Sequence, residues 1–281
     1  MLIDLHSHTK ASDGQLTPSE LVQRAENRQV HFLAITDHDT IDGLAEAAQY
    51  IQDNNLKLQL INGIEITTNW LNHEIHVVGV NIDPTHSALT ELIERQKEKR
   101  EQRAIEMGRR LAKANIPDVY EGAKALAGEG AITRAHFARY MVDIGVADSF
   151  PKVFDKYLSR GNTGYVPHDW IDLEEAIKII HIAGGQAVLA HPDAYKLSNK
   201  WLRKLLVTFK NDGGDAMEVA IGQQNPQMRL QLALWSKEYD LLASQGSDFH
   251  FVGRWRDLGK SLFLPEVCQP IWHNWTVCQT E

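Results

Sequence analysis

The chain has 281 residues and a mass of 31.8 kDa, with 43% hydrophobic residues, which suits one large α/β domain or a domain that carries an insertion. Its formal net charge of −8, from 29 basic and 37 acidic side chains, argues against loose electrostatic binding along nucleic acid. The N-terminal residues do not show the basic and apolar regions of a signal peptide, and no apolar stretch has membrane-spanning length. Cys268 and Cys278 both lie in the C-terminal tail, so we expect a cytoplasmic protein without a disulfide framework or a membrane partner.

The N-terminal stretch MLIDLHSHTKASDG begins with a short apolar strand. His6 and His8 follow it and are two residues apart, so in extended chain their imidazoles project from the same face and can bind one ion. Asp13 lies in the next turn, either as an oxygen ligand or in an Asx turn. A single His-x-His pair is more often two surface histidines, so its interpretation depends on the rest of the chain.

Strands and helices alternate through the next hundred residues. Thr17 is the expected N-cap of the first helix, with Pro18 in the first turn and Glu20 completing a capping box. Further periodic runs predict strands 31–36, 58–64 and 74–80 and helices 41–51 and 87–114. The long helix contains a run of mixed charge at 95–103, for which we expect a solvated face.

This alternation stops between about residues 115 and 164, where every pattern is helical, and then resumes. The expected elements are helices 121–127, 133–142 and 149–158, then helix 173–183, strand 186–190, helix 200–210, strand 216–220, helix 226–238 and strand 241–244. About seven short strands separated by helices predict an α/β fold with a parallel sheet closed into a barrel. An open doubly wound sheet is the alternative, because periodicity alone does not separate the two.

Nine His, Asp and Glu side chains form a pattern along this fold, because most of them follow the C-terminal ends of predicted strands, where sites of parallel α/β folds are built. The set is His6, His8, Asp13, His38, Glu65, His76, His191, Asp248 and His250, with His76 lying within its strand. Singly, each has a simpler interpretation as a helix cap, a turn or a surface side chain. Together they exceed the needs of one tetrahedral ion, so we expect two or three divalent ions, with Glu65 as the bridging carboxylate.

The segments LHSHTKASDG, ITDHDT, GIEI with HEIHVVG, LAHP and GSDFH, in this order, resemble the motifs of the PHP (polymerase and histidinol phosphatase) superfamily. With TRAHFARYM and SRGNTGYVPH, the whole chain is similar to the nucleoside 3′,5′-bisphosphate phosphatases, which also act as the 5′→3′ exoribonuclease RNase AM. The resemblance implies a distorted (β/α)7 barrel of PHP type with a small helical insertion. We expect barrel parts at 1–98 and 165–281 and a substrate cap at 99–164.

The resemblance also implies a trinuclear metal site, with Mn²⁺ as the favoured ion and Zn²⁺ or Fe²⁺ compatible with the mixed nitrogen and oxygen ligands. The implied ligand sets are His6, His8, Glu65 and Asp248 for one ion, Glu65, His76 and His191 for a second, and Asp13, His38 and His250 for a third. Asp37 and Asp39 are expected to orient the imidazoles rather than bind metal. His73 is expected on the opposite strand face from His76, because it is offset by three residues.

The implied activity is cleavage of the 3′ phosphoester of 5′-phosphorylated nucleotides. It would convert 3′,5′-bisphosphates such as pAp to AMP and phosphate, release 5′-mononucleotides from short RNA or RNA 5′ ends, and be consistent with rRNA 5′-end maturation. A water activated by the metals would be the nucleophile, so we assign no catalytic side chain. Arg134 and His136, at the start of a helix, are expected to bind the 5′-phosphate, with Arg160 and Tyr165 as weaker candidates.

Other interpretations remain open from the sequence. Arg134 and His136 can be ordinary surface side chains, and the protein can be a phosphatase for another small metabolite such as histidinol phosphate, or a non-catalytic metal-binding module. A DNA duplex is not an expected partner, and the sequence predicts no oligomeric state. Trp272 and Trp275 can pack on the barrel or contact another subunit.

Overall fold

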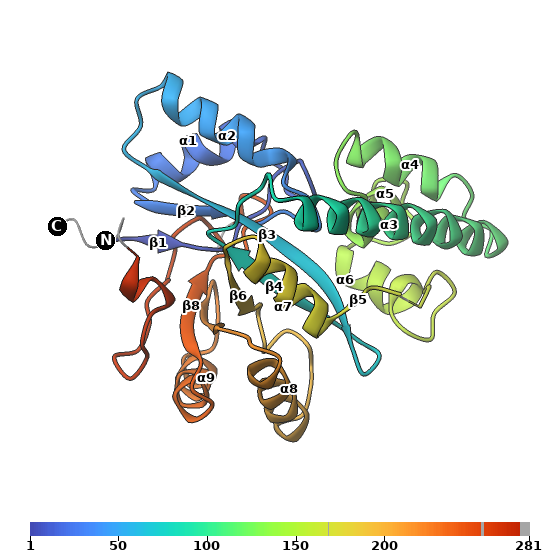
Figure 1. The fold of residues 1–281 in the computed structure, drawn as a ribbon. Coiled ribbons are helices and arrows are strands. Elements are labelled where there is room, and N and C mark those ends of the chain that lie inside the picture. Colours follow the sequence, from blue (N-terminus) through green and yellow to red (C-terminus); the bar gives the residue numbers. More distant parts are fainter. Residues whose placement is uncertain (168, 254–255, 276–281) are drawn as a thin grey trace.

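The computed structural model describes residues 1–167, 169–253 and 256–275, and these form a mixed α/β fold around one curved sheet (Figure 1). The elements up to the middle of the chain are β1 (Ile3–Asp4), α1 (Pro18–Asn27), β2 (Phe32–Ile35), α2 (Asp42–Asp53), β3 (Gln59–Trp70), β4 (His73–Val80), α3 (Ser87–Lys113), α4 (Val119–Ala127) and α5 (Arg134–Asp143). The remainder are α6 (Phe150–Val153), a π-helical turn (Phe154–Leu158), β5 (Ile171–Asp172), α7 (Leu173–Ile182), β6 (Gln186–Leu189), α8 (Asn199–Asn211), β7 (Ala216–Ile221), α9 (Pro226–Glu238), β8 (Leu242–Gly246) and a 3₁₀ turn (Ile271–Asn274).

Seven strands lie side by side in the order β1-β2-β3-β4-β6-β7-β8, and the short β5 pairs with β3. The two ends of this sheet also meet, because Leu5 N–H donates to the Gln245 carbonyl at 3.0 Å and Asp248 N–H donates to the His6 carbonyl at 2.9 Å. The sheet is therefore a nearly closed barrel, and the predicted barrel is confirmed over the open doubly wound alternative. The seven strands of the path correspond to the seven that the sequence predicts.

A buried carboxylate holds the two ends of the sheet together. Asp4 accepts hydrogen bonds from the backbone N–H groups of Ser247, at 2.8 Å, and Gly259, at 2.9 Å. Burial raises the pKa of Asp4, while these backbone donors act in the opposite direction. The contacts fix β1 against the end of β8, and the chain continues from these two strands to five of the nine predicted metal ligands.

The β3–β4 pair departs from the expected parallel order. These strands form an antiparallel hairpin with eight residue pairs, from Gly63 opposite Val80 to Trp70 opposite His73. The two turn residues, Leu71 and Asn72, both have positive φ, as a two-residue hairpin turn requires. Because β4 runs against its neighbours, His76 reaches the site from within a strand rather than from a strand end.

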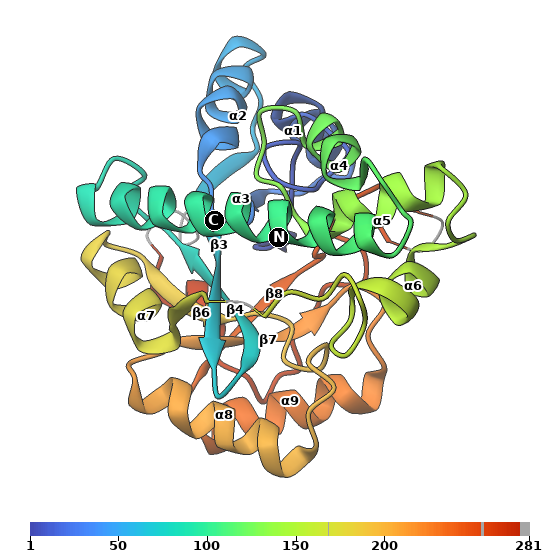
Figure 2. The ribbon, with the colours of Figure 1, turned by 90° about the vertical axis from the view of Figure 1, so that its right-hand side faces the viewer.

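The chain between β4 and β5 is helical and builds its own hydrophobic cluster from α3, α4, α5 and the segment that follows them. The four helical segments expected here are all present, with the last one divided into α6 and the π-helical turn. Figure 2 shows α3 crossing beside the upper end of the sheet, with α4 and α5 packed near it and α8 and α9 on the opposite side. The boundaries of an insertion at 99 and 164 stay a prediction.

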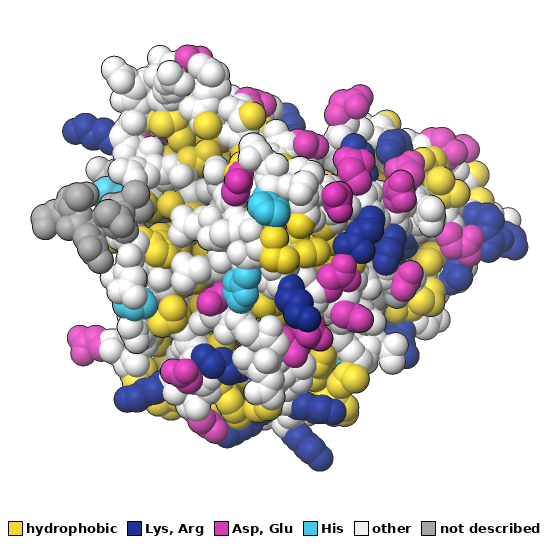
Figure 3. Space-filling view, in the orientation of Figure 1, with side chains coloured by type: hydrophobic (Ala, Val, Ile, Leu, Met, Phe, Trp, Pro, Cys, Tyr) yellow, Lys and Arg dark blue, Asp and Glu magenta, His cyan; other side chains and the backbone are white. Residues whose placement is uncertain are grey.

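The mixed-charge run on α3 is only partly a solvated face. Figure 3 shows acidic and basic side chains interspersed over this part of the surface. Gln96 and Arg100, however, are buried against the barrel. The expectation of a fully solvated face is wrong at these two positions, because their polar groups bind Asp39 and Thr67 of the barrel.

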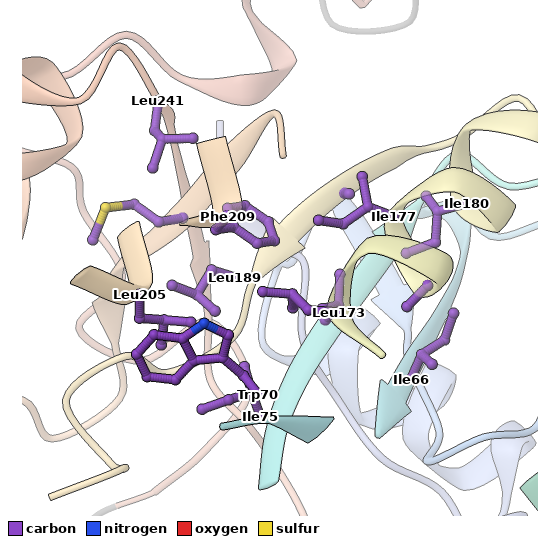
Figure 4. Close-up of a cluster of buried hydrophobic side chains, with 14 of the residues drawn as sticks. Ile66, Trp70, Ile75, Leu173, Ile177, Ile180, Leu189, Leu205, Phe209 and Leu241 are labelled. Atoms are coloured by element: carbon purple, nitrogen blue, oxygen red, sulfur yellow. The ribbon is translucent and has the colours of Figure 1, made fainter. Parts of the chain in front are cut away.

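The largest hydrophobic cluster lies between the sheet and its covering helices. Ile66 and Ile75 of the β3–β4 hairpin and Leu189 of β6 meet Ile177 of α7 and Leu205 of α8, among others (Figure 4). This layer packs the helices on one face of the strands.

The C-terminal tryptophans pack on the barrel, which is one of the two alternatives left open by the sequence. Trp275 is buried in a cluster with Ile3 and Leu5, and its indole N–H donates to Gln186 Oε1 at 2.7 Å. Trp272 packs against the same cluster, and Cys268 is partly buried near Ser236. Cys278 lies outside the described residues. Across the described chain, the helices lack the combined length and apolar character that crossing a membrane would require.

The Asp4 contacts give a stability prediction. Replacing Asp4 with Ala leaves two buried backbone N–H groups without acceptors, so we expect the free energy of unfolding to fall by about 2–4 kcal/mol in urea denaturation. Asp53→Ala, at an exposed position near the end of α2, is the matched control and should change it by less than about 0.5 kcal/mol. Equal effects of the two substitutions would contradict a role for Asp4 in closing the barrel.

Candidate metal centre

The nine predicted ligands converge at one end of the barrel. They come from segments far apart in the sequence but adjacent in the sheet: the chain after β1, after β2, after β6 and after β8, together with β3 and β4 themselves. The groups close enough to hold an ion are His8, Asp13, His38 and His250; His6, His8 and Asp248; His6, Glu65 and His191; and His38, Glu65 and His76.

Glu65 lies at the centre of this arrangement. Its Oε1 is 3.0 Å from His76 Nδ1 and 3.1 Å from His191 Nε2. Its Oε2 is 2.9 Å from His38 Nδ1 and 3.4 Å from the Nε2 atoms of both His6 and His8. One fully buried carboxylate therefore touches five imidazoles, as expected of a bridging ligand.

Asp248 and Asp13 complete the arrangement at its two ends. Asp248 Oδ1 lies 3.5 Å from His6 Nε2 and 3.4 Å from His8 Nε2. Asp13 Oδ1 lies 3.3 Å from His250 Nε2, and its Oδ2 lies 3.8 Å from His38 Nε2. His8 is close to both carboxylates, so it connects the two ends.

The donor set fits divalent ions on two observations. His6 Nε2 and His8 Nε2 lie 3.0 Å apart inside the protein, and each is 3.4–3.5 Å from oxygens of Glu65 and Asp248, so two nitrogen and two carboxylate donors gather in a way that suits a divalent cation. Glu65 Oε2, Asp13 Oδ1 and His38 Nδ1 are buried and have no hydrogen-bond partner among the described residues. Buried atoms of this kind need a partner, and metal coordination supplies one.

The geometric groups differ in detail from the three ligand sets that the family resemblance implies. His76 and His191 fall into separate groups around Glu65, and His8 joins Asp13, His38 and His250. The assignment of each residue to a particular ion therefore stays a prediction. The structure supports the choice of the nine residues by bringing all of them together.

The electrostatics show how strongly the carboxylates and imidazoles interact. Burial alone would raise the pKa values of Glu65, Asp13 and Asp248, but the surrounding imidazoles outweigh it and hold all three well below their usual range. Burial also opposes the charged form of His76, but Glu65 and then Glu74 raise its pKa to about 10. His8 differs, because burial and the charges of His250 and His38 lower its pKa to about 3.

Asp37 and Asp39 do not orient the imidazoles, so that expectation is wrong. Asp37 accepts from the backbone and hydroxyl of Thr9, both at 2.7 Å, and from Ser12 Oγ at 2.6 Å, which fixes the loop that carries Asp13. Asp39 instead pairs with Arg100 of α3 at 2.5 Å. Both acids sit beside His38 in the sequence, but their side chains serve the loops and helices around the centre.

A small pocket of about 140 Å³ adjoins the centre. The predicted ligands Asp13, His38 and His76 are among its lining residues, and so are Arg103, Thr133, Arg134, Phe154 and Trp170. Glu74 lies between the two guanidinium groups, paired with Arg134 and 3.3 Å from Arg103 Nη1, and it accepts from Trp170 Nε1 at 3.0 Å. Although burial would raise it, Arg134, His76 and Arg103 hold the pKa of Glu74 well below its usual range.

The other predicted substrate contacts lie elsewhere. His136 is buried, accepts from Thr133 N–H at 3.1 Å as part of a capping box, and borders a different pocket. Burial lowers its pKa to about 4. Arg160 is exposed and Tyr165 is partly buried, and neither is among the described residues that line the pocket of Arg134. His73 lies away from the centre, near Trp70 and Trp201.

Sequence reasoning missed Glu74 and Arg103. A signal for Glu74 was present, because it is two residues before His76 and so shares its face of the strand. Arg103 is three residues after Arg100, which places both on one side of α3. The sequence alone could not show that this side faces the barrel.

Comparisons with known proteins identify the family of this chain and several similar proteins. The PHP domain model matches residues 4–166. The chain is 53% identical to the 5′-3′ exoribonuclease Rnm of Escherichia coli, over 98% of this chain and 94% of the relative, and 41% identical to the 3′,5′-nucleoside bisphosphate phosphatase of Chromobacterium violaceum, over 97% and 95%. A solved amidohydrolase structure from Chromobacterium violaceum, with bound sulfate and no metal, has a TM-score of 0.91 at 41% identity and covers 97% of this chain and 95% of its own.

The central position of Glu65 gives a prediction about metal binding. Mn²⁺ added to metal-stripped wild-type protein should raise its free energy of unfolding, measured by thermal denaturation. The increase should be about 2.7 kcal/mol at a Mn²⁺ concentration 100 times the dissociation constant. Glu65→Gln removes the charge shared by five imidazoles, so most of this stabilisation should be lost. Glu91→Gln, on an exposed part of α3, is the control and should respond to Mn²⁺ as the wild type does. An undiminished response of Glu65→Gln would contradict the bridging role.

Proposed function

The chain belongs to the PHP domain family, and on this premise we propose that it is a metal-dependent phosphoesterase that cleaves the 3′ phosphoester of 5′-phosphorylated nucleotides. Its substrates are 3′,5′-nucleoside bisphosphates such as pAp and the 5′-phosphorylated ends of RNA. The names of the two curated relatives, an exoribonuclease and a bisphosphate phosphatase, support this pair of substrates.

The observation that carries the proposal is the shared wall between the ligand cluster and the pocket of Arg134. Asp13, His38 and His76 belong to both, so a group bound by Arg134 lies beside the place where the ions would be held. Arg134 is the first residue of α5, and its guanidinium suits a phosphate. The pocket therefore fits a 5′-phosphate while the cluster receives the 3′ phosphoester.

The residues of the chain have separable tasks in this reaction. Bound divalent ions would lower the pKa of a water and neutralise charge on the phosphoryl oxygens and the leaving oxygen. The nine predicted ligands would hold those ions, with Glu65 at the centre of the set. Arg134 and Arg103 bind the 5′-phosphate, and Glu74 keeps the two guanidinium groups in position between substrates. Trp170 supports them, since Arg103 lies over its ring at 5.3 Å.

One orientation of the substrate accounts for both activities. When the 3′ group is a terminal phosphate, cleavage gives AMP and inorganic phosphate. When the 3′ group continues into RNA, the same bond cleavage releases a 5′-mononucleotide and leaves a new 5′-phosphate on the remaining chain. That end can bind in the same way, so degradation proceeds 5′→3′.

The identity of the ions, the kind of RNA substrate and the cellular location are further parts of the proposal. A mixed set of imidazole and carboxylate ligands suits Mn²⁺, with Zn²⁺ and Fe²⁺ as alternatives. The net charge of −8 and the interspersed charges in Figure 3 suit a short RNA end held in a pocket better than a long duplex, and a cytoplasmic location suits such a substrate. The Arg-lined pocket favours a nucleotide substrate over histidinol phosphate.

The deciding experiment uses metal-stripped protein to which Mn²⁺ is returned. Phosphate release from pAp is compared with mononucleotide release from a short 5′-phosphorylated RNA and from the same RNA with a 5′-hydroxyl. We expect Mn²⁺-dependent turnover of pAp and the phosphorylated RNA, and little of the hydroxyl form. Turnover of unrelated phosphomonoesters alone would leave a metal phosphatase and overturn the substrate assignment.

Arg134→Ala tests the phosphate contact. It removes a charge-assisted hydrogen bond to the 5′-phosphate, so kcat/KM for pAp and for 5′-phosphorylated RNA should fall about 10- to 100-fold, equivalent to about 1.5–3 kcal/mol. The low activity on 5′-hydroxyl RNA should hardly change. Arg109→Ala, at an exposed position of α3, is the control, and Arg160→Ala tests the weaker candidate. Equal losses on both forms of RNA in Arg134→Ala would exclude this residue as the 5′-phosphate contact.

A further inference from the structure

Glu218 is a buried acid that the nine-ligand set does not include. It lies in the middle of β7, between Met217 and Val219, and its side chain is only 1% exposed. It belongs to none of the groups of described residues that are close enough to hold an ion. A carboxylate in a central strand needs partners, and those of Glu218 are two predicted metal ligands.

Each carboxylate oxygen of Glu218 accepts from a different ligand residue. His6 Nδ1 lies 2.8 Å from Oε1, and the backbone N–H of His191 donates to Oε2 at 2.6 Å. His6 and His191 are neighbours across the barrel, with ring centroids 5.7 Å apart. One side chain thus contacts ligands that are 185 positions apart in the sequence.

The contact with His6 determines which of its nitrogens faces the centre. When Nδ1 carries the proton that Glu218 accepts, Nε2 has a free lone pair. Nε2 is the atom that lies 3.0 Å from His8 Nε2 and 3.5 Å from Asp248 Oδ1. Glu218 therefore selects the tautomer in which His6 can bind a cation.

The contact with His191 holds an unfavourable backbone conformation. His191 has φ of 25°, a value that residues with a side chain rarely adopt. Such conformations persist where surrounding contacts fix them. The hydrogen bond to Glu218 fixes the backbone at this residue, and His191 Nε2 consequently lies 3.1 Å from Glu65.

We propose that Glu218 is a positioning residue of the metal centre, which sets the tautomer of His6 and the backbone of His191 through its two oxygens. The inference rests on the proposed metal centre but not on the proposed RNA substrate. The proposal predicts that a glutamine at this position cannot replace Glu218. Both partners of Glu218 are donors, and an amide has only one accepting oxygen, so in either orientation its NH₂ group opposes one of them.

The test measures metal binding directly, apart from catalysis. Mn²⁺ binding to metal-stripped protein is measured by calorimetry and by electron paramagnetic resonance for the wild type, Glu218→Gln and Glu218→Asp. We expect Glu218→Gln to weaken binding about 10- to 100-fold or to lose an ion per chain, the usual scale for partners that orient metal-binding imidazoles. Glu218→Asp keeps the charge and should recover part of the affinity. Glu238→Gln, at an exposed position of α9, is the matched control.

Circular dichroism and urea denaturation of the metal-free variants separate positioning from folding. Folded Glu218→Gln with weakened Mn²⁺ binding supports the proposal. Wild-type affinity and stoichiometry in that variant would overturn it, and so would loss of the metal-free fold in both Glu218→Gln and Glu218→Asp, which would make Glu218 a residue of the core. Because no nucleotide is present, failure of the substrate assignment leaves this result unaffected.

Discussion

Three carboxylates and six imidazoles lie in one largely buried volume, and their charges must be compensated. The rest of the structure depends on this constraint. Glu65 has no exposed surface and touches five imidazoles, and several atoms around it have no hydrogen-bond partner in the part of the chain that the structure describes. Such a group of charges is costly to bury unless protons or cations balance it. The barrel makes the arrangement feasible because strand ends from the whole length of the chain meet at one rim. Its closure by Asp4 and the loop held by Asp37 serve the same purpose, since each fixes a segment that carries ligands.

The helical segment is tied to this rim by polar contacts rather than by apolar packing alone. Arg100 of α3 binds Asp39 and Thr67 Oγ1, and Thr133, the N-cap of α5, donates to Asp13 Oδ2 at 3.1 Å. The backbone of Ala131 also donates to the Ala11 carbonyl at 2.8 Å. These contacts place the start of α5, and with it Arg134, at a fixed distance from the ligands. The pocket proposed for the 5′-phosphate thus adjoins the predicted metal ligands.

Much of this could be predicted from the sequence, for identifiable reasons. The seven strands of the barrel, the capping box of Thr17 and Glu20 and the bounds of α9 follow from local patterns, and the structure has all of them. The ligands were recognisable because a parallel barrel brings strand ends together. The antiparallel β3–β4 hairpin, the burial of Arg100 and the partners of Asp37 and Asp39 were not predictable. Each depends on which distant segment lies opposite, and no local pattern carries that information. Glu218 is the clearest case, because its neighbours in the strand are apolar and its partners are at positions 6 and 191.

The predicted metal ligands and the two arginines lie on different kinds of element, and this has a consequence for substrate specificity. The ligands lie on or directly after strands, whose positions are set by the sheet, whereas Arg134 and Arg103 lie on helices of the segment beside it. Glu74 belongs to both parts, since it lies on β4 two residues before His76 and pairs with both arginines. A substrate phosphate that binds the arginines must therefore compete with or rearrange around a carboxylate fixed to the metal-binding sheet. If the arginines bind the 5′-phosphate as proposed, its affinity is coupled to the position of β4, and through His76 and Glu65 to the nine predicted ligands. Such coupling would link recognition of a 5′-phosphate to cleavage at the 3′ side of the same nucleotide.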